Sequence, residues 1–308
     1  MVTLVCGVAR EEPVEMLVQS LNDLGAEYYL LDQEALVDEV ELRWQISDNG
    51  IKGHIKVRGD VINIHEVTSV YHRFMNPEDI HNPEDSINRI NQNRSIIRSL
   101  MDLFDVLPAR IVNRRRPMMS NNSKPYQAML IKKAGFAIAD TIITNNPKTV
   151  MEFAAWNGPL IYKSISSVRS IVDSLDEGSA SRIDSIAYQP TQFQQKIEGF
   201  NLRVHVIGKK LFGTKITSSA VDYRYAAHQG SSTNMRPYEL TVELTKKCLN
   251  LAKICELEFI GIDLIINEDK AYCLEVNPSP GYSYYQNITK QPISDTLGQY
   301  LMEPDSVS

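Results

Sequence analysis

The chain has 308 residues, of which 43% are hydrophobic and 23% are charged, and its formal net charge is −6. This length and composition predict a globular protein of two or three domains. The negative charge argues against general nucleic-acid binding, and no apolar stretch of the sequence approaches the length of a membrane span.

The amino terminus and the cysteines favour a cytoplasmic protein. The first residues are apolar but lack a basic segment, so they predict a strand and not a signal peptide. The four cysteines lie in apolar segments without the pairwise spacing of a metal site: Cys6, Cys248, Cys255 and Cys273. We therefore expect reduced cysteines and no disulfide framework.

The first third of the chain predicts an α/β domain. A strand at 3–6, a helix at 13–24 and a strand at 28–31 form a βαβ unit, which is typical of a parallel sheet with helices on its faces. Irregular strands are predicted at 42–46, 51–57 and 61–64, and a further buried strand at 70–74. A polar loop and a helix that ends near Leu103 follow these strands.

A domain boundary is expected near 108–117. Beyond it, Ser123 and the two asparagines before it can cap a helix over 124–134. Pro147 stands at the first position of a second helix, where its missing N–H costs nothing. An apolar strand at 160–163 comes next.

The last third predicts strands, a long polar loop and an amphipathic helix. The strands are expected at 194–198, 202–207 and 211–217, and the polar loop at 218–237. The helix then carries apolar residues at steps of three and four: Leu240, Leu244, Cys248, Leu251 and Cys255.

The most informative segment is a predicted hairpin of two apolar strands joined by a turn at 267–270. Folding at this turn places Asp263 nearly opposite Glu275, and Asn277 lies on the same strand face two residues beyond. Facing carboxylates repel each other unless a cation lies between them. Three hard oxygen donors suit Mg²⁺ bound together with phosphates, which indicates a nucleotide-using enzyme.

The alternative for the hairpin is a pair of solvated carboxylates, which is common at strand edges. The apolar neighbours of Asp263 and Glu275 favour the metal site, because lone carboxylates beside a buried sheet are uncommon.

Four motifs in this order give the chain a family resemblance. They are Lys124 after a small polar cap, Lys163 at a strand end, the hinge and strand at 194–208, and the hairpin with its three oxygen donors. Over 113–293 the chain resembles the ATP-grasp superfamily, especially its branch of ribosomal-protein glutamate-tail ligases and graspetide (microviridin-type) maturases.

The resemblance implies an α/β fold in three parts. An N-terminal pre-ATP-grasp α/β domain would occupy 1–112, a central ATP-grasp subdomain 113–190, and a C-terminal ATP-grasp subdomain with the metal site 191–308. The two α+β subdomains would clamp ATP between them.

The resemblance also implies roles for individual residues. Lys124 and Lys163 would approach the phosphates of ATP, and Arg203 would act with Lys163 as a catalytic residue on the transferred phosphoryl group. Asp263, Glu275 and Asn277 would bind Mg²⁺ or Mn²⁺. The unspecialised alternatives are solvated lysines and a strand arginine in a surface ion pair.

The remaining nucleotide contacts follow the same resemblance. The backbone of Gln195, Lys196 and Ile197 would meet the adenine edge, and the ribose would contact Asn201 or Glu198. The loop at 164–170 is rich in serine and lacks the glycines that many relatives carry there. Hydroxyl and N–H groups can still bind phosphate, so we expect the loop to cover the phosphates through Ser166 and Ser167, with Arg169 adding charge.

The family reaction is the ATP-dependent joining of a carboxylate to an amine or hydroxyl through an acyl phosphate. A peptide or protein substrate is favoured, and a small-molecule amino-acid or metabolite ligase is the alternative. A non-catalytic nucleotide-sensing protein is the second alternative, disfavoured because the metal-ligand set and Arg203 are all present. A homo-oligomer is left open.

Candidate substrate contacts come from two places. Tyr223 and Arg224 lie in an acidic-aromatic-arginine stretch that resembles one in graspetide maturases, and Arg224 could clamp an acidic side chain. Arg73, between His72 and Phe74, is a further candidate in the N-terminal domain. The tyrosines at 282–285 either form an aromatic wall for a substrate or pack in the core.

Overall fold

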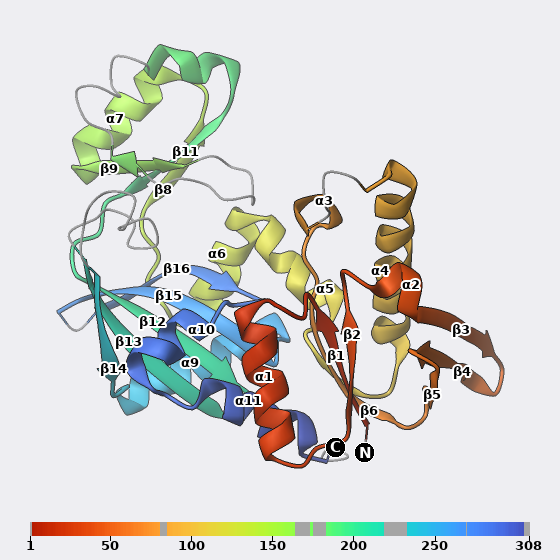
Figure 1. Ribbon diagram of the computed structural model, residues 1–308. Coiled ribbons are helices and arrows are strands. Elements are labelled where there is room, and N and C mark those ends of the chain that lie inside the picture. Colours follow the sequence, from red (N-terminus) through yellow and green to blue (C-terminus); the bar gives the residue numbers. More distant parts are fainter. Residues whose placement is uncertain are drawn as a thin grey trace. The chain divides into compact units, whose positions relative to one another are not determined.

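The computed structural model describes residues 2–80, 85–163, 173–174, 183–218, 233–268 and 270–304 (Figure 1). The chain divides into two compact units. The first unit combines Met1–Met118, Leu257–Phe259 and Ser279–Ser308, and the second combines Met119–Glu256 and Ile260–Pro278. The three-part division with boundaries at 112 and 190 stays a prediction.

The first unit contains a parallel four-stranded sheet in the order β2-β1-β6-β7. Its strands are β1 (Val2–Gly7), β2 (Tyr28–Asp32), β6 (Val67–Arg73) and β7 (Arg110–Val112). Helix α1 (Glu12–Asp23) connects β1 to β2, so the predicted βαβ start is confirmed. The burial of every residue of β1 explains why this strand reads as a continuous apolar run.

A separate antiparallel sheet of the first unit has the order β3-β4-β5. It consists of β3 (Val40–Ser47), β4 (Gly50–Val57) and β5 (Asp60–Asn63), close to the strands predicted at 42–46, 51–57 and 61–64. The helices in this region are α2 (Leu36–Glu39), α3 (Pro77–Ile80), α4 (Ile87–Val106) and α5 (Arg115–Met118). The side chain of Ser86 caps α4, and Leu100, Leu103 and Phe104 of α4 enter the core of this unit.

The carboxyl-terminal helices α10 (Ser283–Thr289) and α11 (Ile293–Met302) also belong to the first unit. Helix α11 packs against α1 and β6. Tyr282 is fully buried and donates a hydrogen bond to the carbonyl of Pro13 at the start of α1. The last segment of the chain therefore completes the core built by the first one.

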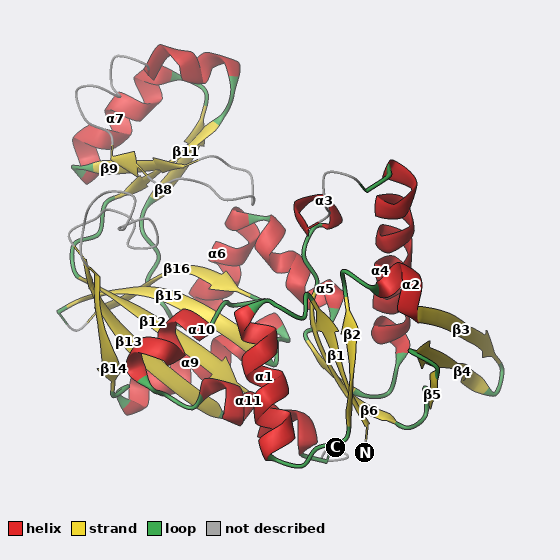
Figure 2. Cartoon of the chain, in the orientation of Figure 1, coloured by secondary structure: helices red, strands yellow, loops and turns green. Residues whose placement is uncertain are grey.

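The second unit contains two sheets, whose strands are yellow in Figure 2 like all strands of the chain. The smaller has the order β10-β9-β11-β8, with β8 (Thr141–Thr144), β9 (Leu160–Lys163), β10 (Asp173–Ser174) and β11 (Thr191–Gln195). Helix α7 (Pro147–Asn157), capped by Asn146, and the 3₁₀ helix η2 (Ile183–Tyr188) accompany it. Val150, Leu160 and Phe193 form its small core.

The larger sheet of the second unit has the order β14-β13-β12-β15-β16. Its strands are β12 (Phe200–Ile207), β13 (Lys210–Ser218), β14 (Thr233–Tyr238), β15 (Phe259–Asn267) and β16 (Lys270–Asn277). A 3₁₀ turn η1 (Met119–Asn122) leads into α6 (Lys124–Lys133), which packs on β16 and on α9 (Val242–Cys255). Ser123 caps α6 as predicted, by accepting a hydrogen bond from the N–H of Tyr126.

Two predicted boundaries in this sheet region were wrong. The strand expected at 194–198 begins at Thr191 and ends at Gln195, so most of the hinge lies outside it. Residues 233–237, expected to belong to a polar loop at 218–237, form part of strand β14, which pairs with β13. Met235 is the one buried residue of β14. Pro237 is tolerated because β14 is an edge strand. For both reasons the sequence of this strand resembles that of a loop.

None of the helices in the described parts of the chain is long and apolar enough to cross a membrane.

Candidate active site

Arg203 and Asp263 form a largely buried ion pair in the second unit. Arg203 lies on β12 and Asp263 on the neighbouring strand β15. The Nη1 atom of Arg203 is 2.8 Å from Oδ2 of Asp263, and the two side chains are only 5% and 17% exposed. The Nε–H of Arg203 also donates to Nε2 of His205, which is fully buried, at 3.4 Å. A guanidinium so far out of water is stabilised by its charged partner.

The hairpin of β15 and β16 brings the predicted metal ligands together. Asp263 pairs directly with Glu275 and Gly261 with Asn277, so the predicted register is confirmed. The register shifts directly after Asp263, at the step to Leu264. Such irregularities re-aim side chains and are frequent beside active sites.

The donor set on this hairpin fits a hard divalent cation. Among the described residues there is no group of three or more His, Cys, Asp and Glu that could hold a metal ion. The set on the hairpin consists of two carboxylates and one amide oxygen, and this chemistry matches Mg²⁺, which is held by few protein ligands together with substrate phosphates. The contact of Arg203 with this set is made by Nη1, which donates to Oδ2 of Asp263.

Helix α6 is fastened to β16 by Gln127. Its Nε2 donates to the carbonyl of Val276 at 2.8 Å, and its Oε1 accepts from the N–H of Val276 at 2.9 Å. Val276 lies between Glu275 and Asn277, so this buried amide sets the position of α6, and of Lys124 at its first turn, against the metal-ligand strand. Lys124 and Glu275 line the same cavity.

A cavity of about 420 Å³ lies beside these groups within the second unit. Charged residues at its wall are Lys124, Asp140 and Glu275. Apolar residues contribute most of the rest, from α6, β8, the segment before β8, and β16: Pro125, Ala128, Ile131, Ile138, Ala139, Ile143, Cys273 and Leu274. A mainly apolar pocket with a few convergent polar groups is the usual form of a small-molecule site.

Gln192 supplies an unusual group to this cavity. Its side chain is 4% exposed, and its Oε1 has no hydrogen-bond partner among the described residues. Its neighbour at the wall, Gln194, donates instead to Oγ1 of Thr141 at 2.9 Å. A buried acceptor without a partner is unfavourable, so the Gln192 carboxamide is suited to a donor on a ligand.

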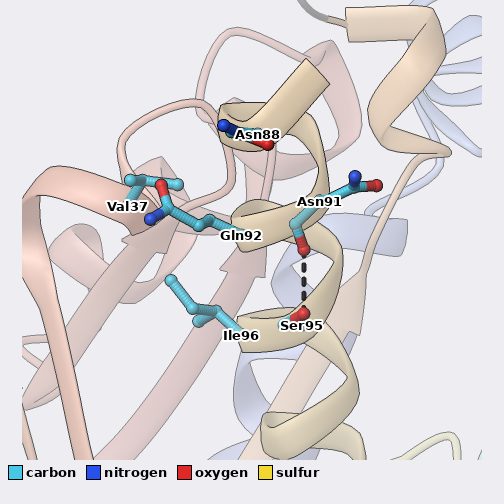
Figure 3. A pocket seen from close by; sticks show the side chains of 6 residues that line it. All are labelled: Val37, Asn88, Asn91, Gln92, Ser95 and Ile96. Carbon is cyan, nitrogen blue, oxygen red and sulfur yellow. Dashed lines mark hydrogen bonds between the residues drawn. The ribbon is translucent and has the colours of Figure 1, made fainter. Parts of the chain in front are cut away.

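A second cavity, of about 560 Å³, lies in the first unit between α2 and α4. Gln92 and Ile96 extend from α4 toward Val37, and the hydroxyl of Ser95 donates to the carbonyl of Asn91 (Figure 3). Its wall consists of neutral amide, hydroxyl and aliphatic groups. Although this cavity is larger, it offers no charge for phosphate or metal, so the cavity at Lys124 and Glu275 is the candidate site.

Part of the backbone of the hinge after β11 is already hydrogen-bonded within the protein. The N–H of Gln195 donates to the carbonyl of Asp140, and that of Lys196 donates to the carbonyl of Pro159, both at 2.9 Å. The carbonyl of Glu198 accepts from Nδ2 of Asn267. Asn201 lies on the same face of β12 as Arg203, two residues away.

Arg73 has its own partners inside the first unit. Its guanidinium pairs with the Glu11 carboxylate, with Nε 2.9 Å from Oε1, and its Nη1 donates to the carbonyl of Ser279 at 2.8 Å. The adjacent His72 is a core residue. Its ring stacks between Phe74 and Phe104, and burial lowers the pKa of His72 to about 4.

The tyrosines at 282–285 divide between the two alternatives stated for them. Tyr282 and Tyr285 are buried in the first unit, whereas Tyr284 is exposed. The buried pair therefore packs the core and does not form an aromatic wall.

Several predicted site residues lie outside the described residues. They are Ser166, Ser167, Arg169, Tyr223 and Arg224. Lys163 is described only as the last backbone position of β9, where it pairs with Gln192.

The structure adds residues that the sequence analysis missed. His205 follows Arg203 by two positions on one strand, and Gln127 follows Lys124 by three on one helix. Both spacings place side chains on a common face, so a polar residue repeated at that spacing was an available signal. Gln192, in contrast, looks like an ordinary strand residue.

The four cysteines are free and buried, as expected. Burial raises the pKa of Cys248 to about 12 and that of Cys255 to about 11. These thiols are therefore packing residues and not nucleophiles.

The fold is that of the ATP-grasp ligases. A family model described as the RimK-like ATP-grasp domain matches residues 123–301, more than half of the chain. The chain therefore belongs to the RimK-like ATP-grasp domain family.

Three individual comparisons accompany this match. The probable alpha-L-glutamate ligase of Vibrio atlanticus (strain LGP32) is 21% identical over 211 residues, which cover 64% of this chain and 69% of that protein. The macrocyclase MdnC from Microcystis aeruginosa MRC, bound with precursor peptide MdnA, is similar in structure with a TM-score of 0.80 and 21% identity, covering 98% of this chain and 99% of MdnC. The ATP-grasp ligase PsnB, complexed with minimal precursor, Mg and ADP, gives a TM-score of 0.77 and 21% identity, covering 97% of this chain and 96% of PsnB.

Proposed function

We propose that this ATP-grasp ligase activates a carboxylate of a peptide as an acyl phosphate and joins it to an amine or hydroxyl. The observation that carries the proposal is the buried Arg203–Asp263 pair, with Glu275 directly across the hairpin from Asp263. Phosphoryl transfer demands positioning and charge neutralisation more than covalent chemistry from the protein. A positive side chain and two carboxylates on adjacent strands provide the elements of that arrangement.

ATP occupies the 420 Å³ cavity in this proposal. The aliphatic wall residues, among them Ile131, Ile143 and Leu274, cover the faces of the base. The unpartnered Oε1 of Gln192 accepts from the 6-amino group of adenine, which is a donor. Since the N–H groups of Gln195 and Lys196 are already used, the hinge contributes through its carbonyls and through Ile197.

The polar end of the nucleotide meets the charged residues. Lys124, at the first turn of α6, and Lys163, at the end of β9, neutralise the phosphates. Asn201 contacts the ribose more readily than Glu198, because it shares the strand face of Arg203. The loop at 164–170, with Ser166, Ser167 and Arg169, covers the phosphates.

The cation is held by Asp263, Glu275 and Asn277, and Mg²⁺ or Mn²⁺ suits these oxygen donors. When bound, such an ion neutralises the charge that develops on the phosphate oxygens. Arg203 keeps its contact with Asp263 and places the positive charge of its guanidinium near the transferred phosphoryl group.

The reaction proceeds in two steps. A carboxylate oxygen of the substrate forms a bond with the γ-phosphorus as the bond to the β,γ-bridging oxygen breaks, which releases ADP. The amine or hydroxyl then attacks the acyl carbon, inorganic phosphate leaves with the former carboxylate oxygen, and the nucleophile loses a proton. Arg203 and Lys163 stabilise the negative charge in the first step.

A peptide substrate is favoured by the comparisons. One relative is named a glutamate ligase, and two similar structures hold precursor peptides. Arg224, with Tyr223 beside it, would clamp an acidic side chain of that peptide. The guanidinium of Arg73 is already engaged in an ion pair with Glu11. Arg73 would therefore contact the substrate together with Glu11 and not as a free charge.

Hydroxylamine trapping tests this function. Purified protein, ATP and Mg²⁺ are mixed with size-fractionated host extract, and new hydroxamates are identified by mass spectrometry. A hydroxamate in the peptide fraction supports the proposal, and its loss on omission of ATP is the control. A hydroxamate confined to the small-molecule fraction would instead establish a metabolite ligase and identify the acid.

A further inference from the structure

The guanidinium of Arg203 lies directly over the α-carbon of Gly261. A β-carbon added at Gly261 would lie 2.0 Å from Nη2 of Arg203, 2.3 Å from Cζ and 2.8 Å from Nε. Side-chain atoms cannot approach a β-carbon so closely, so the present position of Arg203 requires a glycine at 261.

Backbone geometry gives no other reason for this glycine. Gly261 is a regular, buried residue within β15 and is absent from the positive-φ glycines of the chain. A glycine inside a strand lowers β propensity and often marks a close approach of another group. Here the group that approaches is identified as the Arg203 side chain.

The slot over Gly261 and the Asp263 carboxylate lie on one face of β15, because the two residues are two positions apart. Arg203 reaches both from the neighbouring strand β12. Its planar, rigid fork of donors means that a displacement at the slot also displaces the 2.8 Å contact with Asp263.

We infer that Gly261 is a positioning residue for phosphoryl transfer, which rests on the proposed function. Its missing side chain holds the Arg203 guanidinium flat against β15, so that Nη1 stays on Asp263 and Nε stays on His205. Gly261 itself touches neither ATP nor the carboxylate substrate in this role.

The first measurement is a double-mutant cycle on thermal unfolding, with Gly261→Ala, Arg203→Ala and the combined variant. Gly261→Ala alone is expected to lower the unfolding midpoint. In the Arg203→Ala background the added methyl has an empty slot, so the same change is expected to leave the midpoint unaltered. If the single variant does not fold, a folded double variant gives the same answer. Equal losses in both backgrounds would overturn the inference.

A matched control is Gly213→Ala in the same sheet. A β-carbon there would lie 2.5 Å from the carbonyl of Tyr238 and 3.1 Å from Leu240, away from Arg203. Its effect on the midpoint should therefore be the same with and without Arg203. If the effect of Gly213→Ala on the midpoint also depends on Arg203, the coupling seen at Gly261 would reflect a general loosening of the sheet.

The second measurement separates catalysis from binding. A displaced arginine should lower kcat by roughly 10- to 100-fold, since a shift of about 1 Å near reacting groups has effects of that size. The ADP dissociation constant should stay within about threefold of the unmodified protein, which is less than one decade of affinity. Coupling in the unfolding cycle with an unchanged kcat would overturn the positioning role. The unfolding cycle needs no substrate, so it decides the Gly261–Arg203 contact even where no ligase activity is found.

Discussion

Asp263 accepts a 2.8 Å ion-pair hydrogen bond from Arg203 while standing directly opposite Glu275 on the next strand. One carboxylate thus serves a buried guanidinium on one side and a candidate cation site on the other. The two carboxylates are therefore not equivalent, although the sequence presents them as a pair. We therefore expect Asp263 to support both folding and catalysis, and Glu275 to support catalysis alone.

Asp263→Asn should destabilise the protein. The substitution leaves the Arg203 charge buried without a compensating anion, and removal of one partner of a buried pair costs about 3 kcal/mol or more. Denaturant unfolding would measure this loss. An unfolding free energy within about 0.5 kcal/mol of the unmodified protein, the range of neutral surface changes, would mean that Asp263 does not support Arg203.

Glu275→Gln should remove turnover while changing stability little. The carboxylate is a partly buried residue at the cavity wall, and the amide keeps its size but not its charge. We expect kcat to fall by at least about 10²-fold, as for loss of a major electrostatic contact in the transition state. The ADP-release rate at saturating ATP and Mg²⁺ is the measurement. Normal turnover would exclude Glu275 as a metal ligand.

Gln192→Leu should have opposite effects on stability and on nucleotide binding. The change removes a buried acceptor that lacks a partner, so the protein without ligand should be unaffected or gain up to about 1 kcal/mol. ADP affinity should fall by about 5- to 10-fold, the value of one hydrogen bond. Calorimetric titration with ADP, set beside a melting curve, gives both numbers.

Gln194→Leu is the matched control for Gln192. Its amide already donates to Thr141, so this substitution should lower stability. If Gln192→Leu lowers both stability and ADP affinity in the same way as Gln194→Leu, Gln192 has only a structural role.

Arg224→Ala should impair use of the acidic substrate and leave ATP binding intact. The expectation comes from the sequence, because residue 224 lies outside the described residues. Truncation of a charged clamp should raise the peptide KM by roughly tenfold, equivalent to a charge-assisted hydrogen bond. Steady-state kinetics with varied peptide and then varied ATP separates the two substrates. Weaker ATP binding would indicate that Arg224 contacts the nucleotide and not the peptide.

Acid should destabilise the first unit through His72. Burial lowers the pKa of His72 from 6.5 to about 4, so the folded state holds this ring neutral. Below pH 6.5 the unfolded chain binds the proton and the folded chain does not, so stability is lost as the pH falls toward 4. The full loss from this group is about 3 kcal/mol.

Denaturant unfolding at several pH values between 7 and 4 tests the His72 effect. His72→Leu lacks the titrating ring, so its unfolding free energy should depend less on pH over this window even if it is lower at neutral pH. Parallel pH profiles for the two proteins would show that other groups carry the dependence.

The sequence predicts best what depends on neighbours along the chain. The turn at 267–270 is short, so the register that places Asp263 opposite Glu275 follows from local geometry alone. The capping of α6 by Ser123 is equally local. The parallel start of the first unit follows from one βαβ pattern.

The remaining features depend on contacts between distant residues. Arg73 donates to Ser279, which is 206 positions away, and the Arg203 guanidinium covers Gly261, on another strand. Such partners are chosen by side-chain packing, which periodicity and residue type do not encode. Strand β14 was missed for the related reason that its stability comes from pairing with β13 and not from an apolar pattern.

The order in which the chain leaves the ribosome matters for this architecture. The first unit takes its final helices from residues beyond 278, where α11 packs on α1 and Tyr282 fills the space beside Pro13. During synthesis the surface of α1 that contacts α11 therefore stays uncovered until nearly the whole polypeptide has left the ribosome. The second unit can assemble earlier, because its last strand ends by residue 278. The portion made first is thus the one finished last, and a ribosome stalled before residue 279 would leave it exposed to proteases and chaperones.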